Sequence, residues 1–158
     1  PSHKLCTDGR QKVSEHLKRD LAAFFEKRQE INSAYLFGSR AAGSSTPISD
    51  IDIAVSVDKD SLKEGNYPYG YAAHLTSCLM NHLQTNRVDD LLLEDAPPVL
   101  KHRVFTQGVL IFCRDPLEER GAFVKAFREY QDTAPLRRIQ RFYLDRYLKN
   151  LGVPSDRG

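Results

Sequence analysis

The sequence predicts an α/β or α+β domain built around one small sheet of about four strands. Three observations carry this prediction. Residues 49–58 alternate apolar and polar side chains, and this period of two is that of a half-buried strand. Residues 11–28 repeat apolar side chains every three to four positions, which is the period of an amphipathic helix. Further apolar runs and helical patterns then alternate along the chain, as is typical of helices packed on a sheet.

The N-terminal half is predicted to run helix, strand, loop, strand. The helix of residues 11–28 is followed by a short apolar run over 31–37, which predicts a strand that a Gly-Ser pair ends. The small polar residues 40–47 predict a loop or a short helical turn. The alternating segment 49–58 is the second strand.

The C-terminal half is predicted to alternate in the same way. Leucines at four-residue spacing predict a helix over 72–84, after a loop that contains glycine and proline. Residues 88–93 and 109–113 predict strands, and the helix between them begins at a proline pair and is capped by glycine. The rest of the chain, from about 116 to 151, predicts two helices separated at Pro135.

Length and composition are those of an ordinary globular protein. With 158 residues, 41% of them hydrophobic and 28% charged, the chain is expected to form one domain over residues 1–158. Its core is expected over about 10–130 and a helical C-terminal region over about 116–151. The net charge of +2 is too small to indicate direct binding of nucleic acid.

Cysteine use and hydropathy predict a cytoplasmic protein without a membrane partner. Cys6, Cys78 and Cys113 are odd in number and far apart, so they indicate neither a disulfide framework nor a zinc site. No apolar run approaches the roughly 20 residues that a membrane helix needs, and no signal peptide is visible.

Two aspartates on the second strand carry the clearest chemical signal. Asp50 and Asp52 lie two positions apart, so their carboxylates point to the same side with Cα atoms roughly 6.5 Å apart. Both lie opposite the apolar face of Ile51 and Ile53. Two unpaired carboxylates side by side repel each other, and a bound Mg²⁺ ion removes that penalty. The alternative is a solvent-facing strand edge whose charges serve solubility.

A Gly-Ser pair precedes these aspartates by ten residues. Gly38 follows a strand directly and allows a tight turn close to a ligand, while Ser39 adds a hydroxyl to the backbone donors of the turn. The chain then returns as the neighbouring strand. The turn is therefore predicted to bring phosphate donors beside metal-binding carboxylates, as a nucleoside triphosphate requires.

A third carboxylate is predicted at the start of the next strand. Asp89 and Asp90 are adjacent there, and one of them could hold a second metal ion or accept a proton from the acceptor. Their strand faces both carry leucines, so periodicity does not decide between the two residues. A charged strand start without a functional role is the alternative.

This spacing resembles the signature of the DNA-polymerase-β-type nucleotidyltransferases, and most of all that of the minimal nucleotidyltransferases (MNT). The MNT signature is Gly-Ser, ten residues and Asp-x-Asp, and residues 36–41 and 49–55 fit it without a gap. Residues 88–98 and 108–116 resemble the later strand, helix and strand of these proteins. The likeness covers about residues 10–130. It implies a mixed sheet with helices on one face and the nucleotide on the other.

The resemblance also implies roles for single residues. Asp50 and Asp52 are implied to ligate metal, with Asp89 as the third carboxylate of a site for two Mg²⁺ ions. The Gly-Ser pair is implied to hold the triphosphate of ATP. Arg40 is a candidate phosphate contact, for which a surface arginine is the alternative. Many relatives carry arginine where this chain has Ala42, which leaves one nucleotide contact of the family without its counterpart.

The function implied by the resemblance is that of an antitoxin enzyme. An MNT of this length is often paired with a HEPN-domain ribonuclease toxin, which it silences by transferring AMP from ATP to a tyrosine. Two other functions stay open: AMP transfer to a small molecule such as an aminoglycoside, and an antitoxin that only binds its toxin. The basic stretch 137–149 is expected to be a solvated helix face or a docking surface.

Overall fold

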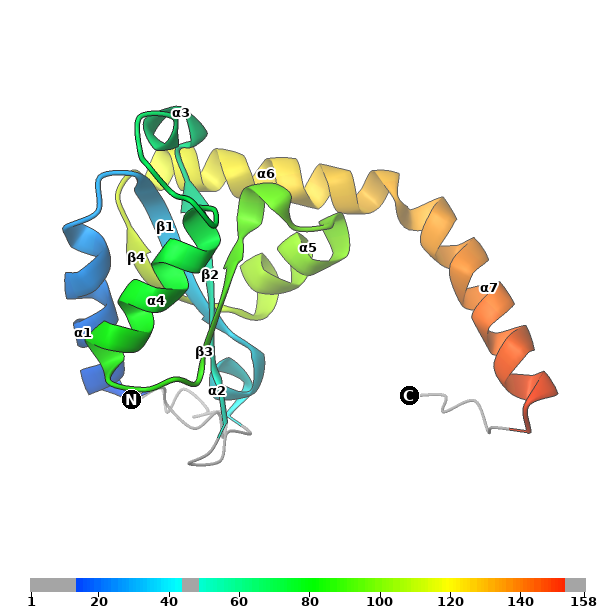
Figure 1. Ribbon diagram of the computed structural model, residues 1–158. Helices are drawn as coiled ribbons and strands as arrows, with labels where there is room; N and C mark the ends of the chain where they lie inside the picture. The colour runs from blue at the N-terminus through cyan, green and yellow to red at the C-terminus, as the bar shows by residue number, and fades with distance from the viewer. Residues whose placement is uncertain (1–13, 44–48, 153–158) are drawn as a thin grey trace, which may run out of the picture.

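The structure is a computed structural model, and it describes residues 14–43 and 49–152 (Figure 1). Its strands are β1 (Ile31–Phe37), β2 (Ile51–Val57), β3 (Val88–Leu92) and β4 (Val109–Cys113). Its helices are α1 (Glu15–Glu26), α2 (Gly38–Ala42), α3 (Lys59–Leu62), α4 (Tyr71–Leu83), α5 (Pro98–Gln107), α6 (Pro116–Asp132) and α7 (Ala134–Asn150), with a 3-10 turn η1 (Leu93–Asp95).

The strands form one mixed sheet with the order β3-β2-β1-β4. Strand β1 is antiparallel to both β2 and β4, whereas β2 and β3 are parallel. The predicted mixed sheet of about four strands is therefore confirmed. Strands β1 and β4 begin and end at the predicted residues, because glycines and charged residues bound these two apolar runs in the sequence.

Helices α1 and α4 cover one face of the sheet and build the main core (Figure 1). The apolar stripes of both helices pack on the branched side chains of β1 and β2. The fully buried residues of this main core include Phe25 of α1, Leu75 and Leu79 of α4, and Ile53 and Val55 of β2. The alternation in residues 49–58 correctly predicted the inward face of β2.

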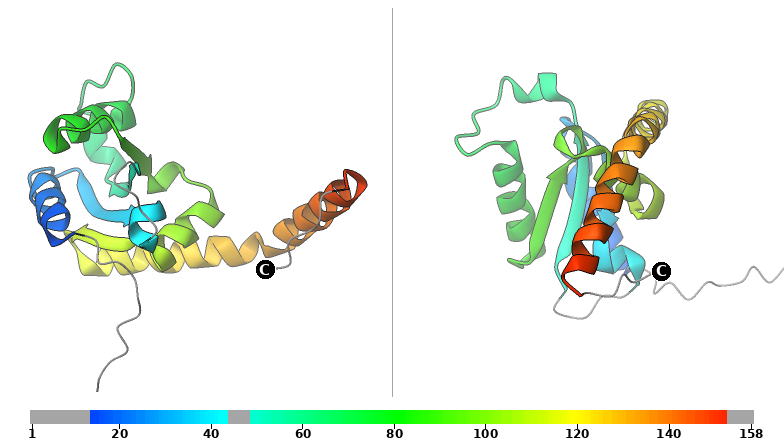
Figure 2. Two further views of the ribbon diagram at one scale, coloured as in Figure 1. Left: turned by 90° about the horizontal axis from the view of Figure 1, so that it is seen from below. Right: turned by 90° about the vertical axis from the view of Figure 1, so that its right-hand side faces the viewer.

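The expectation that helices lie on one face is incomplete. Helices α5 and α6 cover part of the opposite face (Figure 2), where Tyr35, Ala54, Leu93 and Val104 form a second, smaller core. The alternation of residues 49–58 places Ala54 on the same face as Asp50 and Asp52, opposite Ile51 and Ile53. Ala54 is buried because Val104 of α5 packs over it. The two residues are far apart in sequence, so the apolar pattern of residues 49–58 does not predict this contact.

Several sequence expectations fall partly outside the described residues. Residues 11–13 of the first predicted helix and residues 44–48 of the predicted loop are among them, and so is Cys6. Cys78 and Cys113 are free thiols. The short helical turn expected after β1 is α2. Within 14–43 and 49–152, no helix is long and apolar enough to cross a membrane.

Candidate active site

The acidic site lies where β2 begins and pairs with its two neighbours. In the sheet, Asp52 lies directly across from Asp89 of β3 on one side and from Phe37 of β1 on the other. Directly paired residues project to the same face of a sheet, so Asp52 and Asp89 share a face. Asp50 is exposed one residue before β2. The structure thus brings the three predicted carboxylates to one end of the sheet.

The charges at this end act on one another. Burial raises the pKa of Asp52 above its ordinary value of 3.8, and the negative charges of Asp89 and then Asp50 raise it further. Each of these effects disfavours the ionised form of Asp52. A cation placed among the three carboxylates would reverse the effect of the charges.

The structure separates Asp89 from Asp90, which the sequence could not do. Asp90 lies across from Ile53, on the face that α4 covers, and accepts a hydrogen bond from the Thr76 hydroxyl of that helix. Burial raises the pKa of Asp90, and its Oδ2 atom is buried without a hydrogen-bond partner among the described residues. Asp89 is exposed on the other face, beside Asp52. The register of β2 against β3 determines which of the two aspartates lies beside Asp52, and this register cannot be read from the sequence alone.

Gly38 brings the turn after β1 against the carboxylate of Asp52. Its φ angle is +71°, and a Cβ atom at this position would lie 2.2 Å from Asp52 Oδ2. Any side chain would therefore displace the carboxylate and strain the backbone. Ser39 follows within α2, so the predicted neighbourhood of the Gly-Ser turn and the acidic strand is present in the structure.

Arg40 takes up a position that the sequence did not suggest. Its Nε and Nη2 atoms donate to the backbone carbonyl of Ser49 over 3.3 and 2.9 Å. Ser49 immediately precedes Asp50, so Arg40 holds the chain where it enters β2. A direct contact of Arg40 with phosphate stays a prediction.

The donor chemistry of this site fits magnesium, although the protein alone does not complete a site. In the described part of the chain, no three side chains among His, Cys, Asp and Glu are arranged to hold a metal ion by themselves. Magnesium is commonly held by one or two carboxylates, with substrate phosphates and water as the other ligands. Asp50, Asp52 and Asp89 offer hard oxygen donors of this kind, and the pKa of Asp52 is raised by burial and then by the negative charges of the other two.

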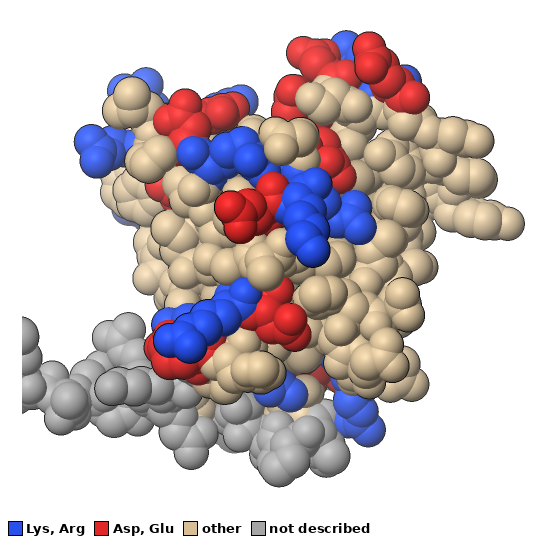
Figure 3. Space-filling model, turned by 90° about the vertical axis from the view of Figure 1, so that its left-hand side faces the viewer, with Lys and Arg blue, Asp and Glu red and all other residues tan. Residues whose placement is uncertain are grey.

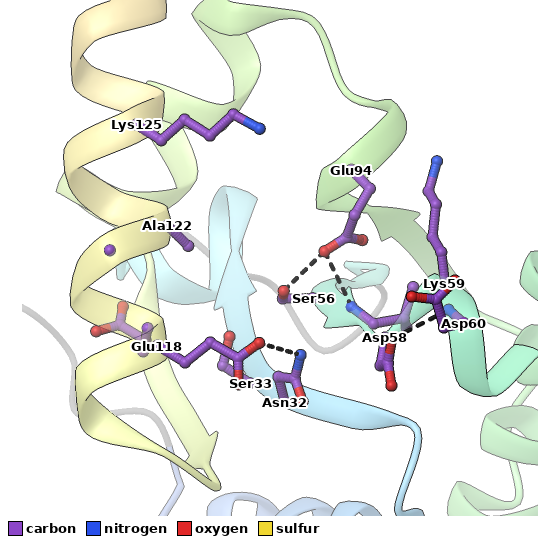
Figure 4. Close-up of a pocket in the computed structure, with 13 residues that line it drawn as sticks. Asn32, Ser33, Ser56, Asp58, Lys59, Asp60, Glu94, Glu118, Ala122 and Lys125 are labelled. Carbon is purple, nitrogen blue, oxygen red and sulfur yellow. Dashed lines mark hydrogen bonds between the residues drawn. The ribbon is translucent and has the colours of Figure 1, made fainter.

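A polar cavity of about 430 Å³ lies at the opposite end of the sheet, away from these residues (Figure 4). Its walls come from the end of β2, from α3 and from α6. Glu94 points into it and accepts hydrogen bonds from the Ser56 hydroxyl, over 2.7 Å, and from the Val57 amide, over 3.0 Å. None of the predicted site residues lines this cavity.

The protein resembles other proteins in sequence and in fold. Residues 19–117 match the family described as "Polymerase beta, Nucleotidyltransferase". No curated protein matches the chain significantly.

Similar solved structures come from toxin–antitoxin complexes. A chain of a toxin–antitoxin crystallised with AMP-PNP is 25% identical, with a TM-score of 0.65, and the match covers 80% of this chain and 98% of that chain. A variant of the toxin–antitoxin MntA-HpeT is 26% identical, with a TM-score of 0.63 and coverages of 80% and 97%.

A third complex shares the fold. The tri-AMPylated HEPN toxin of Shewanella oneidensis in complex with its MNT antitoxin contains a chain 23% identical, with a TM-score of 0.59 and coverages of 82% and 98%. The family match spans more than half of this chain and contains the Gly-Ser turn and all three carboxylates. The protein therefore belongs to the polymerase-β-type nucleotidyltransferase family.

Proposed function

We propose that the protein is an antitoxin that transfers AMP from ATP to a tyrosine hydroxyl of a cognate HEPN-domain ribonuclease toxin and thereby silences it. The observation that carries this proposal is the meeting of Asp52, Asp89 and the Gly38 turn at one end of the sheet. The likeness to toxin–antitoxin chains at 25% and 26% identity, one of them with AMP-PNP, supports the choice of nucleotide and partner.

In this proposal the acidic residues divide two tasks. Asp50 and Asp52 would hold magnesium, which, when bound, neutralises the triphosphate and the charge that develops during transfer. Asp89 of β3 lies directly beside Asp52 of β2 in the sheet, where it can accept the proton of the acceptor hydroxyl. The acceptor oxygen bonds to the α-phosphorus, the bond from that phosphorus to the bridging oxygen breaks, and pyrophosphate leaves.

The turn after β1 positions the nucleotide. The backbone of Gly38 and Ser39 can approach phosphate oxygens closely, because no side chain stands between the turn and Asp52. Arg40 supports this arrangement by fixing the carbonyl that precedes Asp50. Positioning and charge neutralisation supply most of the rate enhancement in such transfers.

The mass of the purified toxin tests the proposal. After incubation with ATP, Mg²⁺ and the wild-type protein, the toxin should gain the mass of one or more AMP units and lose ribonuclease activity. The Asp52→Asn variant should cause no gain. A stable complex that silences the toxin with no gain in mass would overturn the enzymatic function and would indicate an antitoxin that acts by binding.

A further inference from the structure

Helix α7 projects from the body of the protein (Figures 1 and 2), and most of its large apolar side chains are exposed. None of its residues is buried. Six of its large apolar side chains are between 54% and 64% exposed: Leu136, Ile139, Phe142, Tyr143, Leu144 and Tyr147. A helix with so much exposed apolar surface is unusual in a protein that works alone, and such patches mark sites of interaction.

The direction of α7 is fixed by contacts at its first turn. The Arg137 guanidinium lies 3.7 Å above the Tyr130 ring and donates to the Tyr130 carbonyl and the Thr133 hydroxyl. Tyr130 in turn stacks on His102 of α5, with ring centroids 3.8 Å apart. These contacts connect α7 to the helices that cover the sheet, so the exposed helix is presented in a defined orientation.

The sequence of α7 separates an apolar stripe from a basic face. Leu136, Ile139, Tyr143 and Tyr147 recur at three- and four-residue spacing and form the stripe, with Leu144 at its edge. The exposed apolar side chains of α7 together present on the order of 800 Å², which is the area that one partner contributes to a standard protein interface. The exposed apolar surface of α7, which consists of the stripe and the neighbouring Phe142, is therefore large enough to hold a partner protein.

We propose that α7 docks the protein acceptor by laying this stripe into an apolar groove flanked by acidic side chains. The proposal rests on the proposed function, which requires a protein acceptor. Five Lys and Arg residues and a single acid, Asp145, lie between residues 137 and 149. Arg137 and Arg146 fall on opposite borders of the stripe at 100° per residue, Arg137 beside Leu144 and Arg146 beside Ile139. A groove on the partner that complements these basic borders is flanked by acidic side chains.

The same charges argue against a second copy of this chain as the occupant. Two α7 helices packed stripe to stripe would bring Arg137 and Arg146 of both copies together with no acid facing them, because Asp145 lies on the far side of the helix. By contrast, charges of both signs are interspersed on the side of the molecule that carries α1 (Figure 3).

A membrane surface fits the stripe less well than a protein groove. Gln140 lies within the stripe, four residues from both Leu136 and Leu144. Burying its amide among lipid chains is unfavourable, because nothing there can hydrogen-bond to it. A protein groove can supply backbone or side-chain partners.

The placement of α7 suits delivery of an acceptor to the acidic end of the sheet. In Figure 1 and in the right view of Figure 2 the free end of α7 lies at about the height of α2, the helix that begins at Gly38, and the left view of Figure 2 shows a lateral gap between them. Residues 134–150 also lie beyond the family match, which ends at residue 117. Helix α7 can therefore bind the acceptor without taking part in nucleotide binding.

Two adjacent residues of α7 allow a matched test. Ile139→Asp places a charge in the stripe, whereas Arg138→Asp places the same side chain on the far side of the helix and changes the net charge more. In calorimetric titrations of the full-length protein with the cognate HEPN toxin, Ile139→Asp should weaken binding about 30-fold, as for a central interface residue. Arg138→Asp should change the affinity less than about 3-fold, and both variants should keep the wild-type melting temperature.

The outcomes separate docking from catalysis. Asp52→Asn should bind the toxin like the wild type while failing to transfer AMP. If the wild type transfers no AMP but Ile139→Asp still weakens binding to the toxin, the docking proposal is supported and the proposed function is overturned. Equal affinities of the wild type and Ile139→Asp would overturn the docking proposal. It would also be overturned by a wild-type dimer that Ile139→Asp dissociates, or by α7-dependent binding to phosphatidylserine vesicles with toxin affinity unchanged.

Discussion

Strand β2 carries an aspartate near each of its ends, and the two ends differ in how their charges are satisfied. Asp58 follows the strand and caps α3: it accepts from the Asp60 amide over 3.0 Å and from the Ser61 hydroxyl over 2.6 Å. The Ser61 and Asp60 hydrogen bonds lower its pKa. At the other end, burial and the charges of Asp89 and Asp50 raise the pKa of Asp52.

The difference shows which carboxylates the fold needs and which it tolerates. Around Asp58, the neighbouring acids also have donors. Glu94 accepts from Ser56 and Val57 through its Oε1 atom, although its Oε2 atom is buried without a partner among the described residues, and Asp95 pairs with Lys59 over 2.6 Å. These contacts stabilise the structure. The Asp52 end combines like charges that disfavour one another, and an arrangement of that kind is typical of a functional site. The large cavity at the Asp58 end is therefore a poor guide to the chemistry.

The largest expected effect is the loss of AMP transfer on removal of the Asp52 charge. Asp52→Asn should lower the rate by at least ~10³-fold, because a ligand for the charge-neutralising metal is lost. Asp58→Asn, at the other end of the same strand, should transfer AMP at nearly the wild-type rate. Initial rates of AMP transfer from labelled ATP measure both effects. Equal losses of rate in the two variants would contradict the assignment of the active site to the Asp52 end of β2.

A second prediction concerns the adjacent pair on β3. Asp89→Asn should reduce transfer by about 10²-fold or more, since a general base contributes on that scale. Asp90→Asn should stay within about 3-fold, because Asp90 faces α4 and Thr76. Single-turnover rates at saturating ATP compare the two variants. A larger loss of transfer rate in Asp90→Asn than in Asp89→Asn would place the active site on the face of the sheet that α4 covers.

The third prediction tests the closeness of the Gly38 turn to Asp52. Gly38→Ala should slow transfer by about 10²-fold, because displacement of a positioned group by about 1 Å has that effect. The substitution at Gly70, which has a φ of +88° with open space around it, is the matched control. Gly70→Ala should strain the backbone in a similar way and leave the transfer rate nearly unchanged.

The smallest expected effect is on stability and its pH dependence. The folded-state pKa of Asp52 lies above 3.8, so its ionisation destabilises the fold as pH rises through that range. Without Mg²⁺, Asp52→Asn should therefore raise the melting temperature at pH 7 by about 2 °C, a small gain because the group is partly exposed. The gain should vanish below pH 3.8, where the carboxyl is protonated in both states.

Asp58→Asn should act with the opposite sign. Its folded-state pKa lies below 3.8, so ionised Asp58 stabilises the protein at neutral pH, and this contribution is lost as pH falls through the folded-state pKa. The variant should melt at a lower temperature than the wild type at pH 7. Thermal unfolding followed by circular dichroism between pH 3 and pH 8 measures both variants, and shifts of the same sign would contradict the contrast.

Local patterns sufficed for most of the fold. The alternation of 49–58 and the leucine spacing of 72–84 are imposed by burial on one side, so both elements appear within two residues of the predicted bounds. Local patterns predicted helices α5 and α6 but not their packing on the second face of the sheet. Ala54 is too small to signal burial, and its partner Val104 is distant in sequence.

The candidate site was predictable where residues are close in sequence and unpredictable where register decides. The spacing of Gly38, Ser39, Asp50 and Asp52 indicated a turn beside an acidic strand, which the structure contains. Asp89 and Asp90 differ only through the pairing of β3 with β2. The contact of Arg40 with the Ser49 carbonyl depends on how the chain closes between β1 and β2, which residue types alone do not fix.

Binding of Mn²⁺ in the presence of a non-hydrolysable ATP analogue tests the central claim most directly. Electron paramagnetic resonance should show Mn²⁺ bound to the wild type only when the nucleotide is present, since the carboxylates need phosphate oxygens to complete the site. Binding should be lost in Asp52→Asn and kept in Glu94→Gln. Mn²⁺ that still binds to Asp52→Asn, or that is lost in Glu94→Gln, would place the metal and nucleotide at the other end of the sheet.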